Sequence, residues 1–165
     1  MPVTLLGWMA MLGVDLLLHG AILAPWYVEP SPFLLPPERA FALIPLGYLA
    51  LLLLAVLLVW LSARIGIVGW ARGLRFGLTL GALIWGSLAL GLLSISTASP
   101  SLMLGWFIGQ TVQLGVAGMV VGAASGRRRL GRVFLVVLAF VVLCVLITVG
   151  LQSVGVVPTL HRAGP

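Results

Sequence analysis

The chain has 165 residues, of which 62% are hydrophobic and only 7% are charged. Soluble domains carry about 25% charged residues, so this composition excludes an ordinary soluble domain. The net charge of +6 comes from nine arginines and no lysine against three acids. Because most of these arginines fall in short loops between apolar segments, they predict membrane topology and no binding to nucleic acid.

Five apolar segments are each long enough to cross a bilayer, which takes about 20 helical residues. They cover residues 5–23, 40–61, 76–95, 102–124 and 133–157. The first segment contains Asp15 and has neither a basic start nor a small-residue cleavage site, so we interpret it as a true span and not as a signal peptide. The sequence therefore predicts an all-α, polytopic membrane helix bundle that forms a single transmembrane domain over residues 1–165.

The connections between the spans differ in character. Five prolines between Pro25 and Arg39 predict a stretch without regular helix, and Pro45 is expected to kink the second span or to lie in its first turns. The uncharged turn Ser96–Ser101 ends in a helix-start signal. Cys144, the single cysteine, falls in the fifth span, where we expect a small buried apolar residue and no intrachain disulfide.

Two loops hold seven of the nine arginines and are separated by two spans, so they share one side of the membrane. By the positive-inside rule that side is the cytoplasm, which places the N-terminus inside and the C-terminus outside. We expect a multi-pass protein of the bacterial inner (cytoplasmic) membrane, with these basic residues at the membrane surface in contact with anionic lipid. The loop arginines are Arg64, Arg72, Arg75, Arg127, Arg128, Arg129 and Arg132.

Glycines recur on helix faces in two places. Before and within the third span they follow every four residues, and the fourth span repeats the pattern. Small residues at this spacing let helix backbones approach closely, either within the bundle or between molecules. The candidate packing residues are Gly73, Gly77, Gly81, Gly105, Gly109, Gly118 and Gly122.

Asp15 and His19 are one helical turn apart inside the first span, where ionisable side chains are rare and usually functional. Gln110 and Gln113 in the fourth span and Tyr48 in the second are candidate partners. These residues form either a buried hydrogen-bond lock between the first and fourth spans or a proton pathway or ligand site. Both a neutral pair and an ion pair of Asp15 with His19 are compatible with the sequence.

Catalytic chemistry needs a nucleophile or a metal beside a positioned base, and the sequence has no such motif. One intramembrane histidine and one aspartate leave a divalent metal ion short of protein ligands. We therefore expect a protein that is not an enzyme and that has no metal and no cofactor.

Two resemblances add to this interpretation. Asp15-x-x-x-His19-Gly20 and Gly73-Leu-Arg-Phe-Gly77-Leu resemble a group of small uncharacterised bacterial inner-membrane proteins over roughly residues 5 to 125. Such proteins often have four spans, and Gln113 stands where an acidic residue is expected, which puts a charge-based mechanism in doubt for this chain. Trp26-Tyr27, Pro36-Pro37 and Phe41 show a weaker likeness to the first loop of the tryptophan-rich sensory (translocator) proteins, which are five-helix bundles with a porphyrin or sterol pocket.

The sequence thus leads to two hypotheses for function. The first is a non-enzymatic structural or accessory protein that packs with itself, as a homo-oligomer, or with a larger membrane complex, and whose other partner is the lipid bilayer. The alternative is a small transporter or ligand-binding membrane protein that uses an intramembrane polar site of Asp15, His19 and Gln113.

Overall fold

The computed structural model describes residues 1–28, 31–126 and 130–158, which form helices and no strand. The helices are α1 (Pro2–Leu17), a π-helical turn η1 (Leu18–Ile22), α2 (Ala24–Val28), α3 (Pro37–Ala42), α4 (Ile44–Ile65), α5 (Trp70–Ile95), α6 (Pro100–Ala124) and α7 (Leu130–Ser153). Five of these stretches, counting α1 with η1 as one, are long and apolar enough to cross a membrane. The chain is therefore a multi-pass integral membrane protein with an all-helical bundle.

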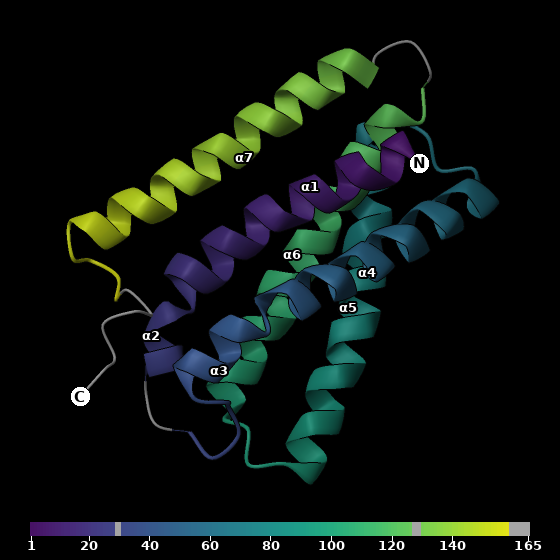
Figure 1. The fold of residues 1–165 in the computed structure, drawn as a ribbon. Coiled ribbons are helices and arrows are strands. Elements are labelled where there is room, and N and C mark those ends of the chain that lie inside the picture. Colours follow the sequence, from purple (N-terminus) through teal and green to yellow (C-terminus); the bar gives the residue numbers. More distant parts are fainter. Residues whose placement is uncertain (29–30, 127–129, 159–165) are drawn as a thin grey trace.

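The bundle is built around α1 and α6, which pack against each other (Figure 1). α7 lies along one side of α1, α4 lies along its other side, and α5 runs beside α6. The turn between α5 and α6 lies at the same end of the bundle as α2 and α3, which we call the proline-rich end. The N-terminus and the α4–α5 connection lie at the opposite end, which we call the arginine end.

Prolines begin several helices, because a fixed φ and a missing N–H suit the first helical turn. Pro25 and Pro37 lie in the first turns of α2 and α3, so the prediction that the proline-rich stretch has no regular helix was wrong at both of its ends. Pro45 lies in the first turn of α4, which is one of the two placements predicted for it. The helix-start signal after residue 96 is confirmed, since the Ser99 side chain caps α6 by accepting a hydrogen bond from the Leu102 amide over 3.3 Å.

The third long helix begins earlier than the predicted span. α5 starts at Trp70, so Arg72 and Arg75 lie on a helix and not in a loop, and Arg64 lies in the last turn of α4. The reason is the packing of this turn on α6, where the Gly69 amide donates to the Gly122 carbonyl over 2.9 Å. Tertiary contact of this kind overrides the low helix propensity of glycine.

The α5–α6 interface is a contact of backbone on backbone. A Cβ added at Gly73 or Gly77 would overlap the carbonyl oxygen of Gly118 or Leu114, and one added at Gly122 would overlap that of Gly69. Such close approach gains dispersion contacts in a lipid environment, where helices gain nothing from a hydrophobic effect between them. Gly81 extends the same seam against Thr111.

Towards the arginine end the core between α1, α4 and α6 is apolar apart from the buried Ser62 on α4. Its buried apolar residues are Met11, Leu51, Ala55, Leu58, Leu114, Ala117 and Val121. Towards the proline-rich end, by contrast, α4 leaves the bundle, and residues 39–50 are exposed apart from the half-exposed Tyr48. The polar residues of α1 and α6 lie beyond the apolar core on this more open side.

Candidate functional site

The candidate site is built on an irregular turn of the first span. The backbone changes from α to π at Leu18, and the Leu23 amide donates to the Leu18 carbonyl five residues back, over 2.7 Å. Turns of this kind are rare and occur frequently at functional sites. The site residue His19 is the second residue of this turn, and Asp15 lies one turn earlier on α1.

The π-turn is held by the last span. In its bonding pattern the carbonyl of Gly20 would pair with residue 25, which is a proline and has no N–H. The Gln152 side chain on α7 supplies the missing donor, since its Nε2 lies 2.9 Å from the Gly20 oxygen. Gly20 also has no Cβ, and one would come within 2.9 Å of the Thr148 side chain, so the glycine allows α7 to approach.

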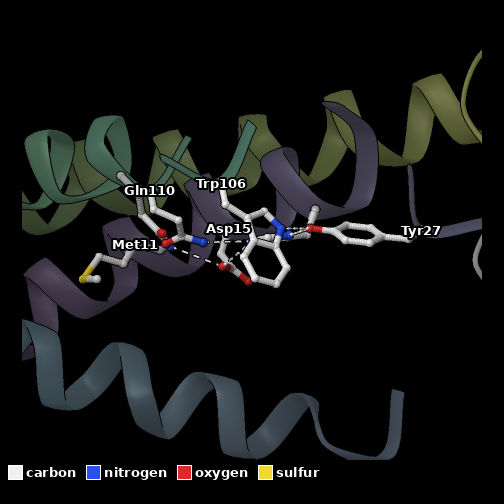
Figure 2. A network of polar contacts seen from close by, with 7 residues as sticks. Met11, Asp15, Tyr27, Trp106 and Gln110 are labelled. Atoms are coloured by element: carbon white, nitrogen blue, oxygen red, sulfur yellow. Dashed lines mark hydrogen bonds and ion pairs between the residues drawn. The ribbon is translucent and has the colours of Figure 1, made fainter. Parts of the chain in front are cut away.

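The imidazole of His19 is the centre of a polar network, shown in Figure 2. Its Nδ1 lies 2.5 Å from the hydroxyl of Tyr27, and its Nε2 lies 2.9 Å from the Nε2 of Gln110 on α6. The Trp106 indole donates to the same Tyr27 hydroxyl over 2.7 Å. The His19 and Tyr27 rings also stack, with centroids 5.6 Å apart. The network therefore joins η1, α2 and α6.

Asp15 extends the network towards the middle of the bundle. Its Oδ1 lies 3.5 Å from His19 Nε2 and 3.4 Å from the Nε2 of Gln113, which are both long contacts. Gln113 makes its better bond elsewhere, donating to the Met11 carbonyl over 2.9 Å. The carboxylate is therefore weakly held, although Figure 2 shows it in the middle of the cluster.

The orientation of the Gln110 amide and the tautomer of His19 are linked. With the Gln110 amide nitrogen facing it, His19 Nε2 accepts with its lone pair. The hydrogen is then on Nδ1 and is donated to the Tyr27 oxygen, which also accepts from Trp106. His19 is thus neutral in this arrangement, and the hydroxyl hydrogen of Tyr27 remains free to be donated.

Two acceptors in the site have no partner in the described structure, namely the side-chain oxygens of Gln110 and Gln113. The two residues are 5% and 0% exposed, so water or lipid headgroups do not reach them from outside. Asp15 and His19 are less enclosed, with side chains 20% and 29% exposed. Three further buried polar atoms without a partner, on Ser62, Trp85 and Thr111, are not bonded to this network.

Four of the five candidate polar residues lie together in the structure: Asp15, His19, Gln110 and Gln113. Tyr48 does not join them by a hydrogen bond in the described part of the chain; its carbonyl accepts from the Trp8 indole over 3.0 Å. Its side chain packs against the apolar core of α1, α4 and α6.

Tyr27 and Trp106 are members of the network that the sequence analysis did not find. Tyr27 lies in a stretch predicted to have no regular helix, and Trp106 has the position of an interfacial tryptophan. One signal was available, because Trp106, Gln110 and Gln113 are spaced i, i+4 and i+7 and so share one face of α6. Burial raises the pKa of Tyr27 above its ordinary value, so its hydroxyl stays protonated at neutral pH.

The remaining candidate residues lie away from this network or shape it indirectly. Gly109 faces the Leu18 side chain at the start of the π-turn, and Gly105 faces Leu23 and Trp26. The Arg64 guanidinium lies over the Trp60 ring at 5.8 Å, and Arg132 lies on α7. Arg127, Arg128 and Arg129 lie outside the described residues.

The described residues contain no group of three or more histidine, cysteine, aspartate or glutamate side chains that could hold a metal ion. Comparison with protein-family models, with curated proteins and with solved structures gives no match for this chain. The two resemblances therefore rest on the quoted residues alone, and the function must be argued from the site.

Proposed function

We propose that this chain is a non-enzymatic membrane protein that binds a small polar molecule at the network of Asp15, His19 and Gln110. The observation that carries the proposal is the pair of buried glutamine side-chain oxygens without a partner beside a weakly held carboxylate. Buried polar atoms are paired in more than about 90% of cases, and an unpaired one costs about 1–3 kcal/mol. A purely structural lock gains nothing from such acceptors, whereas a binding site uses them when its ligand is present.

The position of the site supports binding in preference to transport. On the arginine side of Asp15 the core is apolar apart from Ser62, with Met11, Leu58 and Leu114 each fully buried. A proton or solute pathway through the chain would need polar groups or water there. A ligand has access from the proline-rich end, where Asp15 and His19 are partly exposed. With the predicted topology in a bacterial inner membrane, this end faces away from the cytoplasm.

The accessory hypothesis rests mainly on the glycine faces. In the single chain the seam of Gly73, Gly77, Gly118 and Gly122 is used by the contact of α5 with α6. These glycines are therefore explained without a partner or a second copy. Ligand binding is the function that the geometry supports better.

The test is the substitution Gln110→Met, which keeps the length of the side chain and removes the unpaired oxygen. We expect the free energy of unfolding of the variant to lie within about 1.5 kcal/mol of that of the wild type. The change loses the bond to His19, and this loss is offset by the removal of a buried oxygen without a partner. Native mass spectrometry after gentle extraction should show a bound small molecule on the wild type and not on the variant.

Ser94→Ala on α5 serves as the control, because its hydroxyl bonds only to the Gly91 carbonyl of its own helix and is exposed. This variant should keep the bound molecule. A wild type that is empty after every mild extraction, combined with a Gln110→Met variant that is strongly destabilised, would contradict the proposal and favour a structural lock.

A further inference from the structure

We infer that the ligand is a cation that carries N–H groups, such as a primary ammonium, and that Asp15 is its counter-ion. This inference rests on the proposed binding function and names the class of ligand. Its basis is the balance of donors and acceptors in the site, together with the position of the one carboxylate.

The first step is the balance of hydrogen-bonding groups. The donors of the site are largely occupied: the Gln110 amide by His19, the Trp106 indole by Tyr27, and the Gln113 amide by Met11. The hydroxyl hydrogen of Tyr27 and the second N–H of the Gln110 amide are left. The acceptors without a partner are the two glutamine oxygens, and the Asp15 carboxylate has only two long contacts. A ligand that completes these bonds must therefore bring donors.

The second step is the charge of Asp15. In the described part of the chain His19 is the one basic side chain within ion-pair distance of this carboxylate. Its Nε2 faces the Gln110 amide nitrogen and so carries no hydrogen, which makes His19 neutral. A carboxylate in a membrane-spanning segment needs a cation or a proton. An ammonium group bound between Asp15 and the glutamine oxygens supplies the charge and the donors together.

The third step concerns the surroundings of this position. The rings of His19 and Tyr27 stack at a centroid distance of 5.6 Å, and the Trp106 ring packs at 6.1 Å from that of Phe33. These rings add aromatic, largely apolar surface beside the network. The alkyl part of an organic cation can lie in the apolar phase beside the partly exposed Asp15, while its ammonium group reaches the carboxylate.

The inference is tested by titrating the full-length, detergent-solubilised protein with three probes of equal chain length: n-hexylammonium, n-hexanol and n-hexanoate. Isothermal titration calorimetry measures each affinity. We expect hexylammonium to bind about tenfold or more tightly than hexanol, because a charge-assisted hydrogen bond in a desolvated site is about twice as strong as a neutral one. Hexanoate should not bind.

Asp15→Asn, which removes the charge and keeps the shape, should reduce hexylammonium binding to the level of hexanol. Ser94→Ala on α5, whose exposed hydroxyl bonds within its own helix, is the control and should leave the affinity unchanged. If Asp15→Asn does not fold, the comparison of the three probes on the wild type still decides the inference.

Each other outcome overturns the inference in a distinct way. Equal affinity for hexylammonium and hexanol would show a neutral polar ligand, and the proposed binding function would stand. Preference for hexanoate would show that Gln110 turns its oxygen to a protonated His19, which then pairs with Asp15. Binding of none of the three probes would refute the cation inference, and with an empty wild type in native mass spectrometry it would refute the binding function as well.

Discussion

The substitution Gly77→Ala tests the packing that fixes the position of α6. Gly77 lies near the middle of the α5–α6 seam, and a Cβ there would overlap the Leu114 carbonyl oxygen and come within 3.0 Å of the Gly115 Cα. Carbon atoms attract best at about 3.5–4.0 Å, so the helices must separate locally by about 0.5–1 Å. The separation weakens every contact along the seam.

The magnitude follows from the number of weakened contacts. A shift of about 0.5–1 Å loses a quarter to a half of each attraction of about 0.1–0.2 kcal/mol. For roughly 40 atom pairs, the number that one buried leucine makes, the loss is about 1–4 kcal/mol. Alanine also gains about 1 kcal/mol of helix propensity over glycine, which must be removed from the comparison.

Gly91→Ala on the same helix removes that contribution. Nothing lies within 4 Å of a Cβ added at Gly91, so this variant gains the propensity without the clash. The difference in free energy of unfolding between the two variants, measured by denaturant titration in mixed micelles, should be about 1–4 kcal/mol with Gly77→Ala the less stable. If the free energies of unfolding of the two variants differ by less than about 0.5 kcal/mol, the helices separate without a measurable loss of contact energy, and the reasoning is refuted.

Two further predictions concern the site. Gln152→Leu should destabilise the protein by about 1–3 kcal/mol, because the Gly20 carbonyl then has no donor from α7. Thermal denaturation measures the loss. An unchanged midpoint would show that the carbonyl finds another partner. Tyr27 should ionise later than a free tyrosine when the alkaline titration is followed by tyrosinate absorbance, since burial raises its pKa above 10.0. Because the pKa is higher in the folded than in the unfolded state, the stability that this hydroxyl contributes is complete below pH 10.0 and decreases as the pH rises above it. Tyr27→Phe should remove the absorbance of one tyrosine from the late part of the titration, and an unchanged late amplitude would assign the step to another group.

The spans could be predicted because the bilayer restricts the backbone to few solutions. An apolar run of about 20 residues in lipid must satisfy its N–H and C=O groups internally, which leaves the helix. The ends of the helices were less predictable, since they depend on tertiary contact. α5 begins at Trp70 because its first turn rests on Gly122, a residue more than fifty positions later in the chain.

The part of the site that could be predicted consists of residues that are rare in apolar spans. Asp15, His19, Gln110 and Gln113 are conspicuous because polar side chains are costly in an apolar span. Tyr27 and Trp106 are not conspicuous, because aromatic residues near span ends are expected at any membrane interface. Tyr48 is also a polar residue in an apolar span, but it packs against the apolar core. Which side of α4 faces that core could not be deduced from the weak periodicity of this segment.

The π-turn shows why no single segment of the sequence reveals that these residues lie together. Pro25 removes the donor for the Gly20 carbonyl, and the missing bond is supplied by Gln152, which lies 132 residues further along the chain. Directly after this turn, α2 brings Tyr27 back onto His19, and the α6 face then contacts both through Trp106 and Gln110. The bond from α7 therefore completes the turn that carries His19, and residues of α2, α6 and α7 together determine where the imidazole lies.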